Sequence, residues 1–383
     1  MPTPPSSRSG ERATGIDMLR GLLLLLMTIS HVPVVWSGIW GQPLGFISAA
    51  EGFVFLSAFL AARVFIKRYR QQGAGAATGW AMRRAAHIYL CHLALLALAF
   101  TVIAWLASHF HRPAAMNLLD FYFRDPNLAA ISALALVYQP PLLDILPMYV
   151  LFLLATAPVM LLALRHGWRL PLLLSLGLWG LAQFGLRPRL FDLASRGFDA
   201  SLPFNALGAF DLFAWQGLWV LGLWFGAVGM DALRAEVQRG DGVLVAGLTV
   251  SLSLFIWRHV SGPMGFTDMA RHFFWIDKWT LSPVRVLNFA ALVCLLVGLG
   301  RYWPRLGRMR MLESLGRASL WAFVAHLGSV LLLLLLIDQS DQPLQGPLGW
   351  AAVLFAYCTL FATAALYRVH KRRPALPQAR DSL

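Results

Sequence analysis

Three ionisable side chains lie inside the first two apolar stretches of the chain: Arg20 and His31 in the first, and Glu51 in the second. A charge near the centre of a bilayer costs roughly 2.5–3.5 kcal/mol, so such side chains usually face a cavity and carry function. Eleven helical residues turn about 20° past three full turns and rise roughly 16 Å. We therefore expect Arg20 and His31 on one helix face, with Asp17 near the same stripe, forming a polar path along the helix.

The composition explains why those stretches are apolar. The chain is 58% hydrophobic and 13% charged, with a mean hydropathy of +0.63, which is typical of an integral membrane protein. A span needs about 20 mostly apolar residues, and we predict an all-α polytopic protein with about ten transmembrane helices. The expected spans are 15–36, 46–65, 87–108, 143–164, 169–186, 212–230, 242–259, 284–300, 317–337 and 347–367.

The net charge of +14 does not indicate a nucleic-acid partner, because the basic residues follow the loops between spans and form no soluble domain. Most of them fall in loops that are cytoplasmic if the N-terminus is inside. This bias predicts two cytoplasmic termini in a bacterial inner membrane. We expect a disordered tail over residues 1–14, one transmembrane domain over residues 15–367 and a basic tail over residues 368–383.

Two carboxylates are expected at the periplasmic ends of spans. Glu51 enters the second span, where it could be an anion favoured by the helix dipole, or could act in catalysis or orient His31. Asp144 precedes Pro147 and suits a helix N-cap with proline in the first turn. An N-capping Asp144 could also supply an acid at the mouth of a site.

Other candidate residues are basic or imidazole side chains. Arg84 and His87 lie three residues apart at a cytoplasmic mouth and could grip a phosphate, or Arg84 could serve as a topology anchor. His326, inside the ninth span, could belong to a site or hydrogen-bond a neighbouring helix. Lys278 and Arg285 accompany aromatic residues of a long periplasmic loop, which could stack on sugar rings or form an interfacial belt.

These motifs carry a resemblance. D-x-x-R-G…H at Asp17 to His31, and G-x-x-S…H at Gly316 to His326, resemble the membrane acyltransferase type 3 superfamily. The chain is still more similar to the OpgC family, which succinylates osmoregulated periplasmic glucans. That similarity rests on LRGLLLLLMTISH, GFISAAEGFVFLSAF, YQPPLLDILPMY, FAWQGLWVLG and DKWTLSPVR, in order from residue 15 to about 330.

The resemblance implies transfer of succinyl from cytoplasmic acyl-CoA to glucose hydroxyls of a periplasmic glucan. We expect His31 to act as general base, since an ordinary histidine pKa is about 6.5, with Glu51 or Asp144 holding its ring. Arg20 would stabilise the donor or developing negative charge, and Arg84 would meet the CoA phosphates. The superfamily's third span usually carries Arg-x-x-Arg, whereas here His87 follows Arg84, which leaves the donor-gripping group open.

The expected partners are acyl-CoA, the glucan and the lipid bilayer, with no permanently bound cofactor and no metal. The free carboxylate of a succinyl group needs a cation, for which Arg285, Arg63 and Arg20 are candidates. Three alternatives stay open: O-acetylation of another polysaccharide, transport of an anionic solute or lipid-linked sugar, and a non-catalytic partner of a glucan synthase. The sequence leaves homo-oligomerisation open as well.

Overall fold

A computed structural model describes residues 7–197, 202–230, 235, 241–260, 274–299, 309–338 and 342–372. Over these residues the chain is helical and has no strand, with one isolated bridge between Val34 and Leu344. A helix occupies most of each of the ten expected ranges. The all-α prediction is therefore confirmed.

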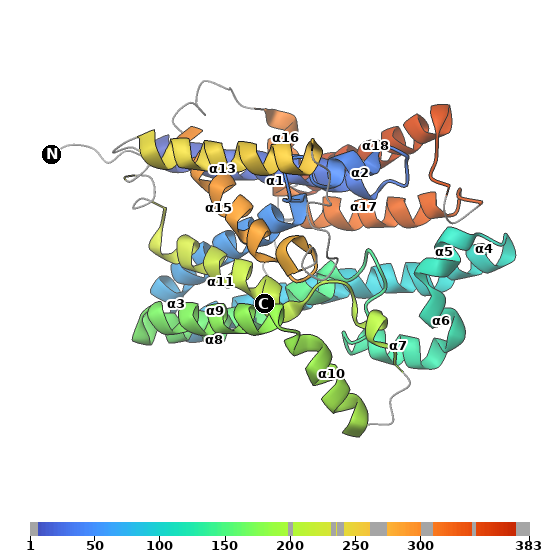
Figure 1. Ribbon diagram of the computed structural model, residues 1–383, viewed down its shortest axis with the longest axis horizontal. Coiled ribbons are helices and arrows are strands. Elements are labelled where there is room, and N and C mark those ends of the chain that lie inside the picture. The colour runs from blue at the N-terminus through green and yellow to red at the C-terminus, as the bar shows by residue number, and fades with distance from the viewer. Residues whose placement is uncertain are drawn as a thin grey trace, which may run out of the picture.

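The longer of the described helices make up most of the bundle (Figure 1). They are α1 (Ser7–His31), α3 (Ala49–Leu98), α8 (Ile145–His166), α9 (Arg169–Gln183), α11 (Leu212–Val228), α13 (Asp241–His259), α15 (Pro283–Leu299), α17 (Ser319–Leu334) and α18 (Gly346–Arg372). The shorter elements are α2 (Ser37–Gly41), the π-helix η1 (Ala99–Ile103), α4 (Ala104–His109), α5 (Pro113–Leu118), α6 (Asp120–Arg124), α7 (Pro126–Leu134), α10 (Leu186–Gly197), the 3-10 helix η2 (Phe204–Leu207) and α16 (Arg310–Arg317).

Five of the described helices are long and apolar enough to cross a membrane, or up to seven if each bent pair counts as one span. This supports a multi-pass membrane protein, but the ten expected spans are not confirmed. The range 169–186 is part of a helix pair bent by 75°, and the range 317–337 belongs to a pair bent by 87°. The orientation of the termini stays a prediction.

The second expected span and the first half of the third belong to a single helical element, α3, which reverses at Gly73. Gly73 has φ +83°, a left-handed conformation that glycine adopts without steric cost. Ser57 and Ile88 line the same cavity, although 31 residues of straight helix would separate them by about 46 Å. The two halves of α3 are therefore antiparallel arms of a hairpin.

The helices pack in two groups that meet at α3. One group joins α3 to α8, α9 and α11, and the other joins α1 to α16, α17 and α18. Gly222 and Gly226 of α11 let the first group pack closely, since a Cβ at either position would lie 2.6 or 2.3 Å from a carbonyl oxygen of α3. Such small-residue contacts are usual between membrane helices.

Helices α1 and α17 both contact α3 as well as each other. The short helices α4 to α7 gather at one end of the bundle, at the right of Figure 1. The junction of α1, α3 and α17 therefore lies between the two helix groups, and the polar residues of α1 face it.

Candidate functional site

The site begins at a close crossing of α1 and α16, where two glycines are required for space. A Cβ on Gly21 would lie 2.1 Å from the Leu312 carbonyl oxygen, and a Cβ on Gly316 would lie 1.8 Å from the Asp17 carbonyl oxygen. Only glycine permits this approach on either helix. The crossing brings the first turn of α17 against α1, and the Arg20 guanidinium donates a hydrogen bond to the Ser319 hydroxyl.

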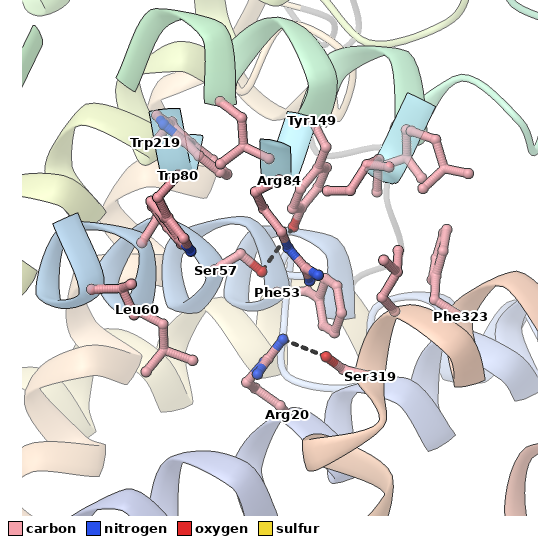
Figure 2. A pocket seen from close by; sticks show the side chains of 17 residues that line it. Arg20, Phe53, Ser57, Leu60, Trp80, Arg84, Tyr149, Trp219, Ser319 and Phe323 are labelled. Carbon is pink, nitrogen blue, oxygen red and sulfur yellow. Dashed lines mark hydrogen bonds between the residues drawn. The ribbon is translucent and has the colours of Figure 1, made fainter. Parts of the chain in front are cut away.

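Arg20 and Ser319 line a cavity of about 290 Å³ between the two helix groups (Figure 2). Its walls come from α1, from both arms of α3, and from α8, α11 and α17. The lining residues are Arg20, Phe53, Ser57, Leu60, Ala61, Val64, Trp80, Arg84, Ile88, Ile145, Leu146, Tyr149, Leu153, Trp219, Ser319, Leu320 and Phe323.

Two cations share this cavity, because the Arg20 and Arg84 guanidinium groups are both directed into it (Figure 2). Within the described part of the chain, no carboxylate lines the cavity. Arg20 Nε is buried without a hydrogen-bond partner, and Arg20 Cζ lies 5.8 Å from the centroid of the Phe53 ring. Two neighbouring cations repel each other unless an anion lies near them. The cavity is therefore suited to an anionic ligand with apolar parts.

Tyr149 adds a polar group to the same cavity. Its hydroxyl donates a hydrogen bond of 3.4 Å to Ser57 Oγ, and its ring packs edge-on against Trp219, with the centroids 5.5 Å apart. The candidate site residues from the sequence did not include Tyr149, and Ser319 entered only as the serine of the G-x-x-S…H motif. The only signal for Tyr149 was its place within a stretch that resembles the family.

Farther along α1, His31 pairs with His326. His31 Nδ1 lies 2.9 Å from His326 Nε2, and the two rings are stacked with an interplanar angle of 10°. His326 Nδ1 lies 3.2 Å from the Phe323 carbonyl oxygen, which can only accept a hydrogen bond. Arg20 and His31 therefore both meet α17, as expected for residues on one face of α1.

The Phe323 carbonyl also decides the tautomers of the two neutral rings. His326 Nδ1 must donate to that oxygen, so His326 Nε2 carries a lone pair and accepts from His31 Nδ1. His31 Nε2 is then the unprotonated nitrogen. The arrangement gives His31 the tautomer that a general base requires.

Glu51 does not hold the His31 ring, which corrects one expected role. Its Oε2 accepts from the Ser48 backbone N–H at 3.0 Å and from the Ser48 hydroxyl at 2.5 Å, closing a capping box at the start of α3. Its Oε1 lies 3.0 Å from Arg285 Nη1 in a fully buried ion pair. Both carboxylate oxygens are thus occupied by the helix cap and by Arg285.

Asp144 sits at the N-cap position of α8, but it does not cap that helix with its side chain. Its Oδ2 accepts instead from the Ala209 backbone N–H at 3.1 Å, because the Asp144 backbone is itself helical (ψ −23°). Burial raises the pKa of Asp144 to about 6, opposed by the Ala209 hydrogen bond and the charge of Lys278. The prediction that the Asp144 side chain caps the helix is therefore wrong. The described hydrogen-bond partner of the His31 ring is His326 and not Asp144.

Arg84 and His87 have different surroundings in the structure. Arg84 lines the cavity, whereas the His87 ring packs edge-on against Trp321, with the centroids 5.4 Å apart. Asp17 Oδ2 lies 3.5 Å from Arg317 Nε across the crossing of α1 and α16. Of the expected donor-binding residues, Arg20 and Arg84 thus share one site, while His87 and Asp17 make contacts outside the cavity lining.

Arg285 and Lys278 lie near the start of α3. Arg285 is buried and donates to the carbonyl oxygens of Ile276 and Phe46 as well as to Glu51. Lys278 Nζ lies 4.9 Å from the centroid of the Trp279 ring, and burial lowers the pKa of Lys278. Phe273, one of the aromatic residues noted in this loop, lies outside the described residues.

No curated protein and no solved structure matches the chain. The family model described as OpgC protein matches residues 12–372, which is nearly the whole chain. The chain therefore belongs to the OpgC family.

Proposed function

We propose that this protein is a membrane O-acyltransferase that moves a succinyl group from cytoplasmic succinyl-CoA to glucose hydroxyls of periplasmic glucans. Membership of the OpgC family supports a transferase that acts on glucans. The observation that carries the proposal is the hydrogen-bond chain from the Phe323 carbonyl through His326 to His31. It leaves His31 Nε2 free to accept a proton, on the same helix as the arginine cavity.

His31 acts as general base in this proposal. As the sugar oxygen attacks the thioester carbonyl, His31 Nε2 takes the proton of the hydroxyl. The carbon–sulfur bond then breaks, the acyl group stays on the sugar as an ester, and the proton passes from His31 to the departing CoA thiolate. No oxidant, reductant or metal is needed for this balance.

His326 stabilises the step without touching the substrates. When His31 becomes an imidazolium, its Nδ1–H still donates to the His326 lone pair, so the added charge keeps a hydrogen-bond partner. The fixed tautomer also leaves His31 Nε2 unprotonated at the start of each turnover. His326 is therefore a positioning residue.

The Arg20 and Arg84 cavity serves the donor. Coenzyme A is an anion with phosphate groups at one end and a thioester at the other, joined by a long, thin arm. Arg20 lies roughly 16 Å along α1 from His31, so a donor anchored by its phosphates at the arginines extends its arm toward the histidine. Guanidinium groups suit this task because they bind phosphate bidentately.

The wall of the cavity fits the remainder of such a ligand. Phe53, Trp80, Trp219 and Phe323 present aromatic surface around the two charges. Apolar walls with few polar groups are usual for sites that bind small organic molecules. The CoA donor is a substrate here, and the proposal includes no bound cofactor.

The test is transfer by the purified full-length protein in detergent. Succinyl-CoA and a cyclic or linear β-glucan are supplied, and the glucan mass is measured. The proposal predicts a succinyl increment on the glucan and release of free CoA. An acetyl increment from acetyl-CoA, with none from succinyl-CoA, would support the same mechanism with acetyl-CoA as the donor. Unmodified glucan with both donors would favour a transporter or a non-catalytic partner.

A further inference from the structure

The cavity between the two helix groups has an open end and a buried end. Its wall includes both arms of α3, and on each arm the exposed fraction of the lining side chains increases toward the turn at Gly73. On the first arm Phe53 is buried, whereas Val64 is 36% exposed. On the second arm Ile88 is buried, whereas Trp80 is half-buried. A ligand therefore enters between Val64 and Trp80.

The buried end borders the histidine pair through two aromatic rings. The Phe53 and Phe323 rings both line the cavity and stack with their centroids 6.1 Å apart. The Phe323 ring also packs edge-on against the His326 ring, with the centroids 5.2 Å apart, and His326 is the hydrogen-bond partner of His31. The reactive end of a donor therefore points toward Phe323, and the rest of the donor extends toward Trp80.

Trp80 presents an unoccupied ring to this cavity. Over the part of the chain that the structure describes, its indole makes no hydrogen bond and no ring contact. Trp219, the other tryptophan of the cavity wall, differs, because its Nε1 donates to the Thr156 hydroxyl at 3.0 Å and its ring packs against Tyr149 and Phe152. Trp219 thus belongs to the packing of α8 against α11, whereas the Trp80 ring is available to a ligand (Figure 2).

Trp80 and the two arginines of the cavity suit a planar group that carries phosphate. Trp80 precedes Arg84 by one turn of the same arm of α3, so the two side chains lie on one face, about 6 Å apart along the axis. Figure 2 shows Arg84 between Trp80 and Phe323, with Arg20 across from Arg84. Guanidinium groups bind phosphate, and an aromatic ring stacks on a nucleobase. A nucleotide with its phosphates at the arginines therefore places its base on Trp80.

The covalent structure of coenzyme A has its groups in the same order. The diphosphate of coenzyme A joins the adenosine part to the thin arm that ends in the thioester. When the diphosphate is at the arginines and the thioester is directed past Phe323 toward His31, the adenosine part extends the opposite way, toward the open end and Trp80. An acyl group on phosphopantetheine alone has the arm and a phosphate, but no base to place there.

We propose that Trp80 stacks on the adenine ring of the donor and so selects a nucleotide thioester, such as succinyl-CoA, over an acyl group carried on phosphopantetheine alone. This inference rests on the proposed function and assigns the base-binding part of the donor site. The contact lies at the end of the donor away from the thioester. Trp80 therefore acts on donor affinity and not on the chemistry at His31.

The experiment compares succinyl-CoA with S-succinyl-4′-phosphopantetheine as donors for purified full-length wild-type protein, Trp80→Leu and Trp80→Phe. Stacking of a base on an aromatic side chain changes affinity roughly 5- to 100-fold. Trp80→Leu should raise the KM for succinyl-CoA by that factor, with kcat unchanged, and should leave the KM for the phosphopantetheine donor at its wild-type value. Trp80→Phe should keep most of the affinity for succinyl-CoA, because its ring can still stack.

Trp105→Leu is the matched control, because Trp105 is exposed on α4 and does not line the cavity, so it should change neither KM. A second readout needs no turnover: the rise in Tm that free CoA produces should shrink in Trp80→Leu, whereas the rise that 4′-phosphopantetheine produces should not. An equal loss with both ligands, or no loss with either, would overturn the role of Trp80. A wild-type protein that transfers succinyl from neither donor would overturn the proposed function, and the Tm readout would still decide whether Trp80 binds the base.

Discussion

His31 Nδ1 on α1 and His326 Nε2 on α17 lie 2.9 Å apart, although 295 residues separate them in the sequence. The Phe323 carbonyl fixes the direction of this hydrogen bond, since a carbonyl cannot donate. The packing of α1 against α17 thus fixes one tautomer of His31. A change that separates α1 from α17 at this pair of histidines should therefore lower kcat.

His326→Ala should lower kcat about 10- to 100-fold, because it leaves His31 Nδ1 without its buried acceptor. His326→Gln should recover part of the loss, since the amide oxygen can accept from His31 Nδ1. The KM for the donor should be unchanged in both variants. The measurement is initial-rate transfer from acyl-CoA, and equal activity of wild type and His326→Ala would exclude the positioning role.

Gly316→Ala should destabilise the protein by about 1–3 kcal/mol, as overpacking commonly does, because the new Cβ would meet the Asp17 carbonyl oxygen. The displacement should also separate Arg20 from Ser319 and raise the donor KM. Thermal unfolding in detergent measures the first effect and donor titration the second. Gly328→Ala is the control, since its Cβ would lie 3.8 Å from the nearest atom, on Leu98; a similar drop in Tm for both variants would contradict the explanation.

Arg84→Met should raise the donor KM about 10-fold or more, because one of the two cations of the cavity is lost. Arg83→Met provides the comparison, since Arg83 is the neighbouring exposed arginine of α3 and does not line the cavity. His87→Ala should also leave KM near the wild-type value. If Arg83→Met and Arg84→Met behave alike, the basic residues act through general charge at the mouth rather than through this cavity.

Asp144 should make stability depend on pH between about 4 and 7. Its folded-state pKa is raised to about 6 from 3.8, chiefly by burial, so the folded state binds the proton more tightly than the unfolded state. Burial of the ionised Asp144 carboxylate costs the folded state free energy above pH 6. This cost disappears as the pH falls toward 4, a change of roughly 3 kcal/mol in the free energy of unfolding. The contribution of Asp144 alone therefore favours the folded state increasingly as the pH falls over this range, and comparison with a variant that does not titrate at this position isolates it.

Asp144→Asn is the matched variant for that test. The amide oxygen can still accept from the Ala209 N–H, but the side chain no longer titrates. Between pH 7 and pH 5, the Tm of wild type should increase relative to the Tm of Asp144→Asn. A pH dependence that is the same in both proteins would assign the effect to another group.

Much of the fold could be predicted from the sequence. Apolar runs of about 20 residues predict membrane helices because an unpaired backbone group is costly in lipid, and helices lie at each of the ten ranges. The count of complete spans was not predictable in the same way. The bends after α9 and α16, of 75° and 87°, depend on tertiary packing, which hydropathy does not record.

The candidate site was predicted only in part. Helical periodicity placed Arg20 and His31 on one face of α1, and both contact α17. The partners could not be predicted, since Glu51 and Arg285 are 234 residues apart and periodicity reports nothing on contacts between helices. Glu51 therefore looked equally suited to a helix cap and to His31, and the structure shows the cap and the ion pair.

The most direct test of the account is the mass of periplasmic glucans from a deletion strain that carries either the wild-type gene or His31→Ala. Membrane insertion and protein level are checked in both strains. We predict a succinyl increment on the glucans with wild type and its absence with His31→Ala. Glucans that carry the same succinyl increment in both strains would contradict His31 as the general base.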